Sequence, residues 1–178
     1  GGVQTAVVVG DGEIDVDEHG RVACKFHWDT ASVSRRVRVS QGWAGPGYGL
    51  VTHPRVGDEV VIAYLDADAD EPLIVGRVHN GTNVSPLTLP KDKTVSVWRT
   101  KSSPGGDGYN EILMDDAAGQ ERFEVHAQRD YKEVVERDED VHIKRNHNLK
   151  VDGNHNLLVR GTGDLHYQSP FQITGPKG

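Results

Sequence analysis

The residues from Glu121 onward repeat with a period of eight, and this repeat restricts the possible folds more than any other feature of the chain. Seven octads follow one another over positions 121–176. They read ERFEVHAQ, RDYKEVVE, RDEDVHIK, RNHNLKVD, GNHNLLVR, GTGDLHYQ and SPFQITGP. Aligning the octads gives eight columns, numbered one to eight. A fixed short period is typical of folds that stack one structural unit many times.

Apolar residues gather in the odd columns of the octad. Column five reads Val125, Glu133, Val141, Leu149, Leu157, Leu165 and Ile173. Column seven reads Ala127, Val135, Ile143, Val151, Val159, Tyr167 and Gly175, and column three reads Phe123, Tyr131, Glu139, His147, His155, Gly163 and Phe171. Residues two apart in an extended chain point to the same side, so these columns share one face. The predicted core is Val125, Val135, Val141, Ile143, Leu149, Val151, Leu157, Val159, Leu165 and Tyr167.

Columns eight, one and two carry the signals of a corner. Column eight is mostly polar, and column two holds Asn or Asp in four octads. Asn and Asp side chains bond their own backbone in turns. Column one becomes glycine at Gly153 and Gly161, which predicts a kink with backbone angles that favour glycine. Each octad is therefore expected to form one straight side followed by one corner.

A single chain with this repeat has too few turns to close a core. Three octads, about 24 residues, make one triangular turn, whereas stacked folds need several repeats to become stable. Three chains wound together fill every layer, and each strand then pairs with the strands above and below it. Residues 121–178 are therefore predicted to form an intertwined triple-stranded β-helix, a trimeric prism roughly 34 Å tall with layers about 4.8 Å apart.

The first half of the chain predicts short strands separated by turns. The expected strands are Thr5–Val9, Gly20–Asp29, Val37–Ser40, Glu59–Leu65 and Leu73–Val78. In the second of them one face holds Arg21, Ala23, Lys25 and His27. The other face, which we expect to be buried, holds Val22, Cys24, Phe26 and Trp28. The Gly- and Pro-rich stretches 45–47 and 54–57 read as loops.

Five short strands within about 80 residues predict a small antiparallel barrel, of which the OB fold is a common form. The fold class is therefore all-β. We expect an OB-type barrel at residues 1–90, a neck with a first hairpin at 91–120 and the octad repeat at 121–178.

Composition excludes several functional classes. The chain of 178 residues has 20 Lys+Arg against 27 Asp+Glu, a net charge of −7, which argues against a nucleic-acid partner. No run approaches the roughly 18 apolar residues of a membrane-spanning helix. One cysteine rules out an intrachain disulfide framework. No basic-then-apolar leader opens the chain, so we expect no signal peptide, and the Gly1-Gly2 start is expected to be a cut within a longer protein.

Several strings in the chain resemble one protein family. These are GRVACKFHWD (20–29), VRVSQGWAG (37–45), PRVGDEVVI (54–62), PLIVGRVHNG (72–81), SSPGG (102–106) and GQERFEVHAQRD (119–130). They occur in the expected order over nearly the whole chain and resemble the VgrG family, the valine–glycine repeat spike proteins of bacterial type VI secretion systems. The family is similar to the central spike of contractile phage tails. This chain has Arg36 where many relatives have an aromatic residue.

The resemblance implies a mechanical rather than an enzymatic protein. It implies a homotrimeric, membrane-puncturing spike that is assembled in the bacterial cytoplasm and ejected through the envelope. It further implies an inner-tube protein bound through an amino-terminal body that this sequence lacks, and a tip-capping protein or effectors at the carboxyl end. The alternative is an OB-type binding module trimerised by a β-helical stalk. For nucleic acid, that alternative depends on the basic cluster Arg35, Arg36 and Arg38 and on the aromatic residues Phe26, Trp28, Trp43 and Tyr48.

Histidines in the repeat supply the candidates for a metal site, although we expect no cofactor. His147 and His155 lie eight residues apart in column three, so a trimer would bring three imidazoles together in each of two layers. The competing interpretation is a hydrated polar segment of the core. His166 is a third candidate, because some related phage spikes bind iron near the tip through histidines.

No constellation in the sequence predicts catalysis. Asp115 and Asp116 precede Ala117-Ala118-Gly119, which reads as a hairpin turn with solvated acids. Cys24 alternates inward, as a small buried residue does rather than a nucleophile.

Overall fold

The computed structural model of the chain describes residues 2–29, 33–68, 70–172 and 174–175. The chain divides into two compact units, Gly1–Lys132 and Glu133–Gly178. The first unit contains every strand of the described residues, and the second is extended chain without strand pairing. The described residues are all-β apart from the single helical turn η1 (Leu65–Ala67). Among them, no helix is both long and apolar enough to cross a bilayer.

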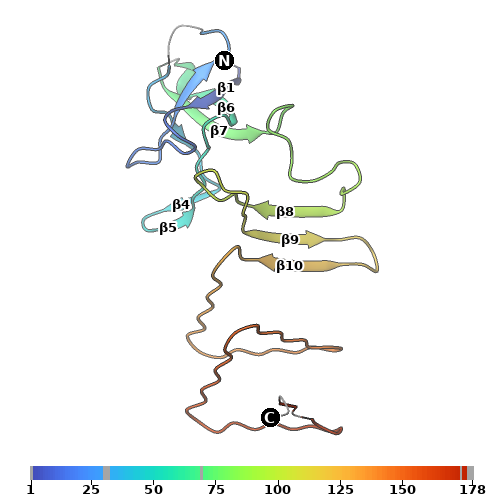
Figure 1. Ribbon diagram of the computed structural model, residues 1–178. Coiled ribbons are helices and arrows are strands. Elements are labelled where there is room, and N and C mark those ends of the chain that lie inside the picture. The colour runs from blue at the N-terminus through green and yellow to red at the C-terminus, as the bar shows by residue number, and fades with distance from the viewer. Residues whose placement is uncertain (1, 30–32, 69, 173, 176–178) are drawn as a thin grey trace. The chain divides into compact units, whose positions relative to one another are not determined.

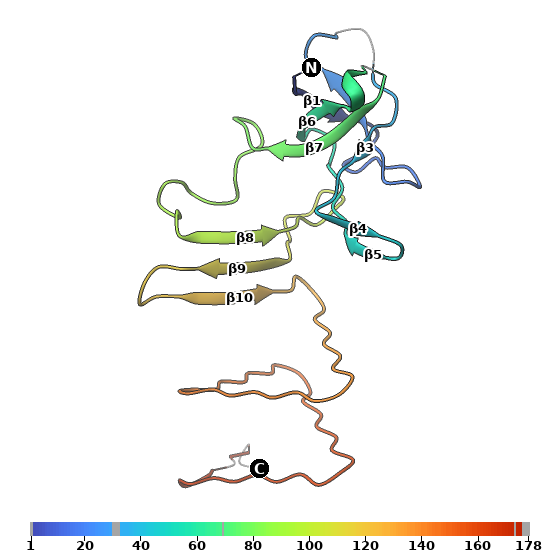
Figure 2. The same cartoon turned by 180° about the vertical axis from the view of Figure 1, so that it is seen from behind.

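Five strands of the first unit form one sheet in the order β2-β1-β6-β7-β3. Figure 2 labels β1, β6, β7 and β3 of this sheet. The strands are β1 (Gln4–Val9), β2 (Ala23–Phe26), β3 (Arg38–Val39), β6 (Glu59–Tyr64) and β7 (Pro72–Val78). An antiparallel bridge between Val22 and Val37 links the two ends of this order and closes the barrel. The sequence placed each of these strands. One difference is that β3 pairs with β7 in parallel, whereas the other ladders of the sheet are antiparallel.

Along these strands, every second side chain points into the barrel, and these inward side chains form its core. The core consists of side chains that are at most 1% exposed: Ala6, Val8, Val22, Cys24, Val37, Val60, Ile62 and Ile74. The prediction that Trp28 belongs to this face is wrong, because its side chain is 68% exposed. Strand β2 ends at Phe26 and the chain then turns, which breaks the alternation before residue 28. Trp28 lies outside, with its indole N–H 3.0 Å from Gln4 Oε1 and its ring stacked on Phe26.

A short hairpin interrupts the barrel where the sequence suggested only a loop. Strands β4 (Trp43–Gly45) and β5 (Tyr48–Leu50) pair antiparallel, and Pro46 and Gly47 form the turn between them. Gly47 has a φ of 81°, which favours glycine at this position. The alternation was too short for the sequence to distinguish this hairpin from the loop around it.

The neck region contains a three-stranded antiparallel sheet in the order β10-β9-β8. Its strands are β8 (Val95–Arg99), β9 (Glu111–Asp115) and β10 (Arg122–His126). The hairpin predicted at 117–119 is confirmed, and Gly119 has a φ of 78° in the turn. Strand β8 was not predicted. Strand β10 lies within the first octad of the repeat. The repeat therefore begins as the edge strand of a sheet whose other two strands, β8 and β9, precede it in the same chain.

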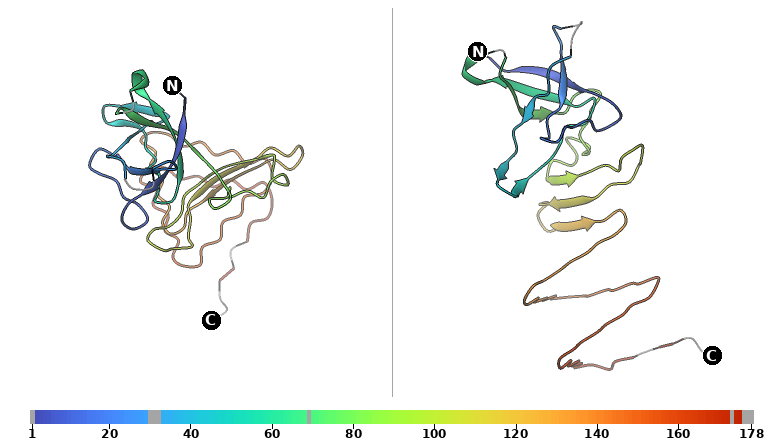
Figure 3. Two further views of the ribbon diagram at one scale, coloured as in Figure 1. Left: turned by 90° about the horizontal axis from the view of Figure 1, so that it is seen from above. Right: turned by 90° about the vertical axis from the view of Figure 1, so that its left-hand side faces the viewer.

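The second unit bends at intervals of eight residues. Together with the bend just before it, at 128–129, bends occur at 136–137, 144–145, 152–153, 160–161 and 168–169. Each bend joins column eight of one octad to column one of the next, as the repeat predicts. Figures 1 and 3 show straight stretches of extended backbone joined by bends, and a later stretch runs in the same direction as an earlier one.

The two corner glycines do not have the conformation predicted for them. Neither Gly153 nor Gly161 has a positive φ, and a Cβ added at either position would contact nothing within 4 Å. Three of the other corners carry arginine in column one: Arg129, Arg137 and Arg145. Because arginine forms the same bend, the corner needs only ordinary backbone angles.

Candidate functional site

The octad repeat leaves its apolar columns exposed in a single chain. In column five, Val141, Leu149, Leu157 and Leu165 are 66–79% exposed. In column seven, Val135, Ile143, Val151, Val159 and Tyr167 are 44–56% exposed. Burial of such side chains is the main driving force for folding and association. The apolar face of the repeat is therefore the candidate functional site, because this chain alone does not cover it.

Columns three and seven meet on the inner side of the corners. The rings of Tyr167 (column seven) and Phe171 (column three) stack across the corner at 168–169, with centroids 4.2 Å apart and planes at 17°. Across the corner at 160–161, a Cβ at Gly163 would lie 3.6 Å from Cγ1 of Val159. Lys150 and Asp152, from columns six and eight, form an ion pair of 3.0 Å. These contacts agree with odd columns on one side of the chain and even columns on the other.

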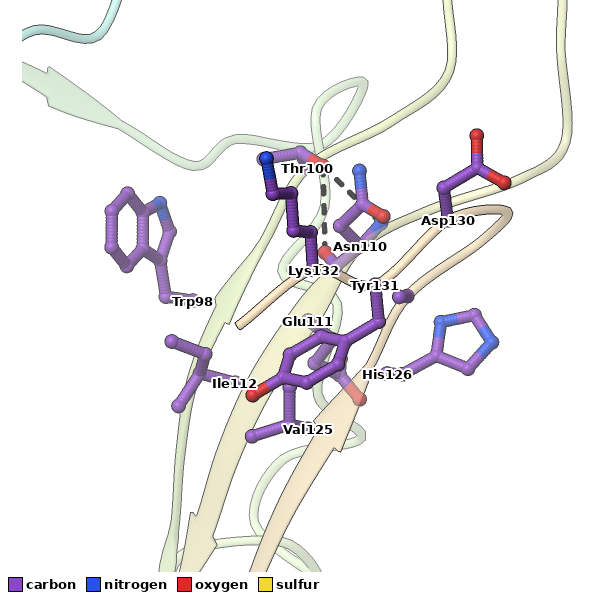
Figure 4. Close-up of a pocket in the computed structure, with 11 residues that line it drawn as sticks. Trp98, Thr100, Asn110, Glu111, Ile112, Val125, His126, Asp130, Tyr131 and Lys132 are labelled. Carbon is purple, nitrogen blue, oxygen red and sulfur yellow. Dashed lines mark hydrogen bonds between the residues drawn. The ribbon is translucent and has the colours of Figure 1, made fainter. Parts of the chain in front are cut away.

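An open hollow of about 430 Å³ lies beside the corner at 128–129, within the first unit. Its apolar lining comes from Trp98 on β8, Ile112 on β9, and Val125, Ala127 and Tyr131 of the repeat. Figure 4 shows the Tyr131 ring beside Val125. The three repeat residues belong to columns five, seven and three. The hollow is therefore the inner side of the corner, and this chain's own side chains leave it open.

The backbone of the repeat lacks hydrogen-bond partners, just as its apolar face lacks a covering surface. No backbone hydrogen bond joins any two of the described residues 134–172. Extended chain presents a full row of N–H and C=O groups, and isolated strands gain too little in water to hold one conformation. The repeat thus offers both hydrogen-bonding edges and an apolar face to another polypeptide.

Comparison with known proteins links these features to a family. Residues 4–79 match the family described as the type VI secretion system/phage-baseplate injector OB domain, and residues 96–169 match the bacteriophage T4 gp5 C-terminal trimerisation domain. The first match covers the barrel, and the second covers the neck sheet and the octads. A spike protein of the type VI secretion system, VgrG4b of Pseudomonas aeruginosa, is 48% identical over 142 residues.

The chain belongs to the VgrG family. Two further relatives are 46% identical to it over 142 residues: VgrG5, a type VI secretion system spike protein of Pseudomonas aeruginosa, and the actin cross-linking toxin VgrG1 of Vibrio cholerae. Each of these matches covers 76% of this chain but only 13–18% of the relative. The resemblance seen in the sequence is thereby confirmed, together with the OB and trimerisation domains. The spike role follows for the family, and the chain represents a small part of its relatives' length.

A polar network missed by the sequence analysis fixes the neck of this VgrG chain. The Glu111 carboxylate on β9 is 8% exposed and pairs with the Arg99 guanidinium on β8. The hydrogen bond from Arg99 to Glu111 raises the pKa of Arg99. The guanidinium lies 4.7 Å from the centroid of the Tyr109 ring, which stacks on His126.

The structure also shows the environments of a residue from the basic cluster and of the single cysteine. Arg36, from the basic cluster, donates a hydrogen bond of 2.7 Å to the Asp15 carboxylate and forms an ion pair with it. That hydrogen bond lowers the pKa of Asp15. Cys24 is buried, and burial raises the pKa of its thiol to about 11, so the nucleophilic thiolate is scarce.

The two carboxylates at the hairpin have different environments. Asp115 accepts hydrogen bonds from the Thr94 hydroxyl and the Ala117 N–H, which lower its pKa. Asp115 therefore caps the turn instead of being simply solvated, while Asp116 is exposed.

The described part of one chain gathers no group of three His, Cys, Asp or Glu side chains suited to a metal ion. His147, His155 and His166 thus belong to no such group among the described residues of one chain.

Proposed function

We propose that three copies of the chain form a homotrimer in which residues 121–178 wind into an intertwined triple-stranded β-helix. The observation that carries the proposal is the corner at every eighth residue, with apolar columns meeting inside the corners and no backbone partner along the sides. Two further copies, rotated about the same axis, would supply both the missing strands and the missing core. The match of residues 96–169 to a trimerisation domain supports the same arrangement.

The proposed core of each layer is formed by columns five and seven from all three chains. Val125, Val135, Val141, Ile143, Leu149, Val151, Leu157, Val159, Leu165 and Tyr167 would surround the axis. Fully burying one such side chain contributes about 1.5–3 kcal/mol. Thirty of them in a trimer would make the repeat far more stable than the sum of three separate chains, since each chain alone exposes almost half or more of every one of these side chains.

Light scattering of the purified chain tests this proposal directly. We expect a mass of three chains and a band on SDS gels that collapses to the monomer only after heating. Strands without a free lateral edge would also resist protease. A folded, stable single chain at micromolar concentration would overturn the proposal.

Within the secretion apparatus, we propose that the trimer is the membrane-puncturing part of a spike. Its stiffness would come from the closed prism. The remaining length of its relatives suggests an amino-terminal body that docks on the inner-tube protein, while a tip-capping protein or effectors bind near the carboxyl end. The spike would be assembled in the bacterial cytoplasm and ejected through the envelope.

A segment exchange tests the spike role. The part of VgrG4b that corresponds to this chain would be replaced by the whole chain, residues 1–178, in Pseudomonas aeruginosa, and secretion of the inner-tube protein into the medium would be measured. We expect secretion to continue, and to stop when the exchanged segment carries Leu157→Asp. Loss of secretion by the unmutated exchange, while the chain still forms trimers in solution, would contradict the spike role but not the trimer.

We propose that this chain is not an enzyme. Its buried thiol, paired arginines and hairpin aspartates are each explained by packing or local hydrogen bonds. The name of the Vibrio cholerae toxin describes a protein of which this chain matches 13%. The alternative, an OB-type module that binds single-stranded nucleic acid, is tested by binding at low salt, where even a weak electrostatic site becomes measurable.

A further inference from the structure

In two outward columns of the repeat, four and eight, charged residues alternate in sign from one octad to the next. Column eight reads Glu136, Lys144, Asp152 and Arg160 in successive octads. Column four reads Glu124, Lys132 and Asp140 in the first three. Every consecutive pair in both series joins an acid to a base. The core columns account for the apolar pattern, but nothing in the core requires this order of charges.

Within one chain these alternating charges do not meet. The corners at 136–137, 144–145, 152–153 and 160–161 separate the members of column eight, so each member lies one side further around the turn than the member before it. Among the described residues, none of the ion pairs joins two residues of column eight or two of column four. The ion pairs present in the repeat are local, such as Lys150 with Asp152 at 3.0 Å.

Threefold symmetry brings the alternating charges together between chains. If one chain places octad n on one side of the prism, its octad n+1 lies on the next side, one layer further along. The second chain, rotated by a third of a turn, already has its own octad n on that side. Neighbouring layers on each side therefore hold octads n and n+1 of different chains, about 4.8 Å apart and with equal columns opposite each other.

We propose that columns four and eight form ladders of ion pairs between chains, and that these ladders fix the register of the three strands. This proposal rests on the trimer proposed above. In register, Glu136 of one chain lies beside Lys144 of the next, and Asp152 beside Arg160. A slip of one octad places Glu136 beside Asp152 or beside a second Glu136. Opposite charges directly across a strand pair stabilise it, and like charges destabilise it.

Such a device answers a specific problem of the repeat. A slip by a whole octad keeps every apolar column facing inward, so the core alone discriminates weakly between registers. The first column does not alternate, because it stacks Arg129, Arg137 and Arg145. Two of these arginines pair with the following aspartate of their own chain, Arg129 with Asp130 at 3.2 Å and Arg137 with Asp138 at 3.1 Å.

Two charge-swapped variants of equal net charge test the ladder. The blocked variant, Lys144→Glu with Asp152→Lys, orders column eight as two acids followed by two bases. The inverted variant, Glu136→Lys, Lys144→Glu, Asp152→Lys and Arg160→Glu, keeps the alternation with the opposite sign. Both variants lose the local pair of Lys150 with Asp152, so that loss cancels in the comparison.

The measurement is the urea concentration at which the trimer dissociates, in about 10 mM and in about 1 M NaCl, because salt screens exposed charges. We expect the blocked variant to dissociate at clearly lower urea in low salt, the inverted variant to match the wild type despite twice as many substitutions, and the differences to shrink in high salt. Equal midpoints for all three trimers in low salt would overturn the ladder and leave the trimer intact. A wild-type chain that is monomeric would overturn the trimer and the ladder together.

Discussion

The barrel and the octad repeat consist of the same extended backbone, yet only the barrel is complete within one chain. Eight barrel side chains are at most 1% exposed, and antiparallel ladders pair most of its strands. In the repeat, the corresponding apolar columns stay between 44% and 79% exposed, and the described backbone from 134 to 172 is unpaired. Local conformation therefore does not explain the difference in burial.

The direction of the turns explains it. In the barrel, connections such as the one through η1 between β6 and β7 reverse the chain, so a strand returns beside its predecessor and pairs with it. In the repeat, every corner continues the winding, so consecutive sides separate and their neighbours must come from elsewhere. A hairpin fold can be finished by one chain, whereas a wound fold with few turns needs more copies of itself.

The largest effect is expected from two adjacent leucines in the repeat. Leu157 and Leu158 are 79% and 76% exposed in one chain, so a single chain does not distinguish them. Leu157 belongs to the inward column five and Leu158 to the outward column six. Leu157→Asp would bury three uncompensated carboxylates in one layer at several kcal/mol each. We expect Leu157→Asp to abolish the trimer and Leu158→Asp to preserve it, measured by light scattering.

The two variants serve as controls for each other, because the substitution and the neighbourhood are the same. If both variants remained trimeric, or if both became monomeric, the division of the repeat into inward and outward columns would be incorrect.

The second prediction applies the same adjacent-pair comparison to the barrel. Ile74 and Val75 are neighbours on β7, but here the single chain distinguishes them, with 1% and 45% exposure. We expect Ile74→Ala to lower the stability of the barrel by about 2–5 kcal/mol, and Val75→Ala to change it little. The SDS-resistant trimer should persist in both, since the repeat does not depend on the barrel core. Loss of SDS resistance in Ile74→Ala would show that the two regions fold as one unit.

The sequence predicted most of the fold because its periodicities are long. Alternation over a full strand placed the five barrel strands, and seven octads placed each corner of the repeat. Predictions failed where a signal was short: Trp28 lies two residues beyond the end of β2, and the β4–β5 hairpin has three residues in each strand. The prediction of unusual backbone angles at Gly153 and Gly161 failed because a glycine permits such angles without requiring them.

The sequence predicted the apolar face of the repeat, but it did not predict the polar contacts in the neck sheet that precedes it. The pair of Arg99 with Glu111 joins strands twelve residues apart, and Tyr109 lies in the loop between them. Such contacts depend on the register of β8 against β9, which no short motif encodes. Whole-column patterns are visible in a sequence, whereas a single ion pair becomes visible only once the strands are placed.

A smaller effect, confined to the barrel unit, is expected from pH. Partial burial acts to raise the pKa of Asp17, but hydrogen bonds from the Arg21 backbone N–H, the Arg21 guanidinium and the His19 N–H hold it at about 2. A lowered pKa stabilises the fold above the ordinary value near 4, and this contribution is lost as the pH falls toward 2. We expect Asp17→Asn to melt a few degrees below the wild type at pH 6, with the gap closing by about pH 2.

The neighbouring Glu18, whose side chain is 78% exposed, supplies the control for the pH experiment. Glu18→Gln should melt like the wild type across the same pH range. A gap between Asp17→Asn and the wild type that stays constant from pH 6 to pH 2 would show that the hydrogen bonds at Asp17 do not depend on its charge.

The smallest expected effect concerns metal in the repeat. A trimer would place three His147 side chains in one layer and three His155 side chains in the next, each flanked by asparagines in the sequence. Asparagine and water satisfy imidazole nitrogens as well as a metal does, so the polar layers need no ion to be stable. We expect elemental analysis of trimer purified without chelators to find well below one metal per trimer. One equivalent or more that disappears in His147→Asn or His155→Asn would instead make these layers a metal site, and the same loss in His166→Asn would place the site near the carboxyl end.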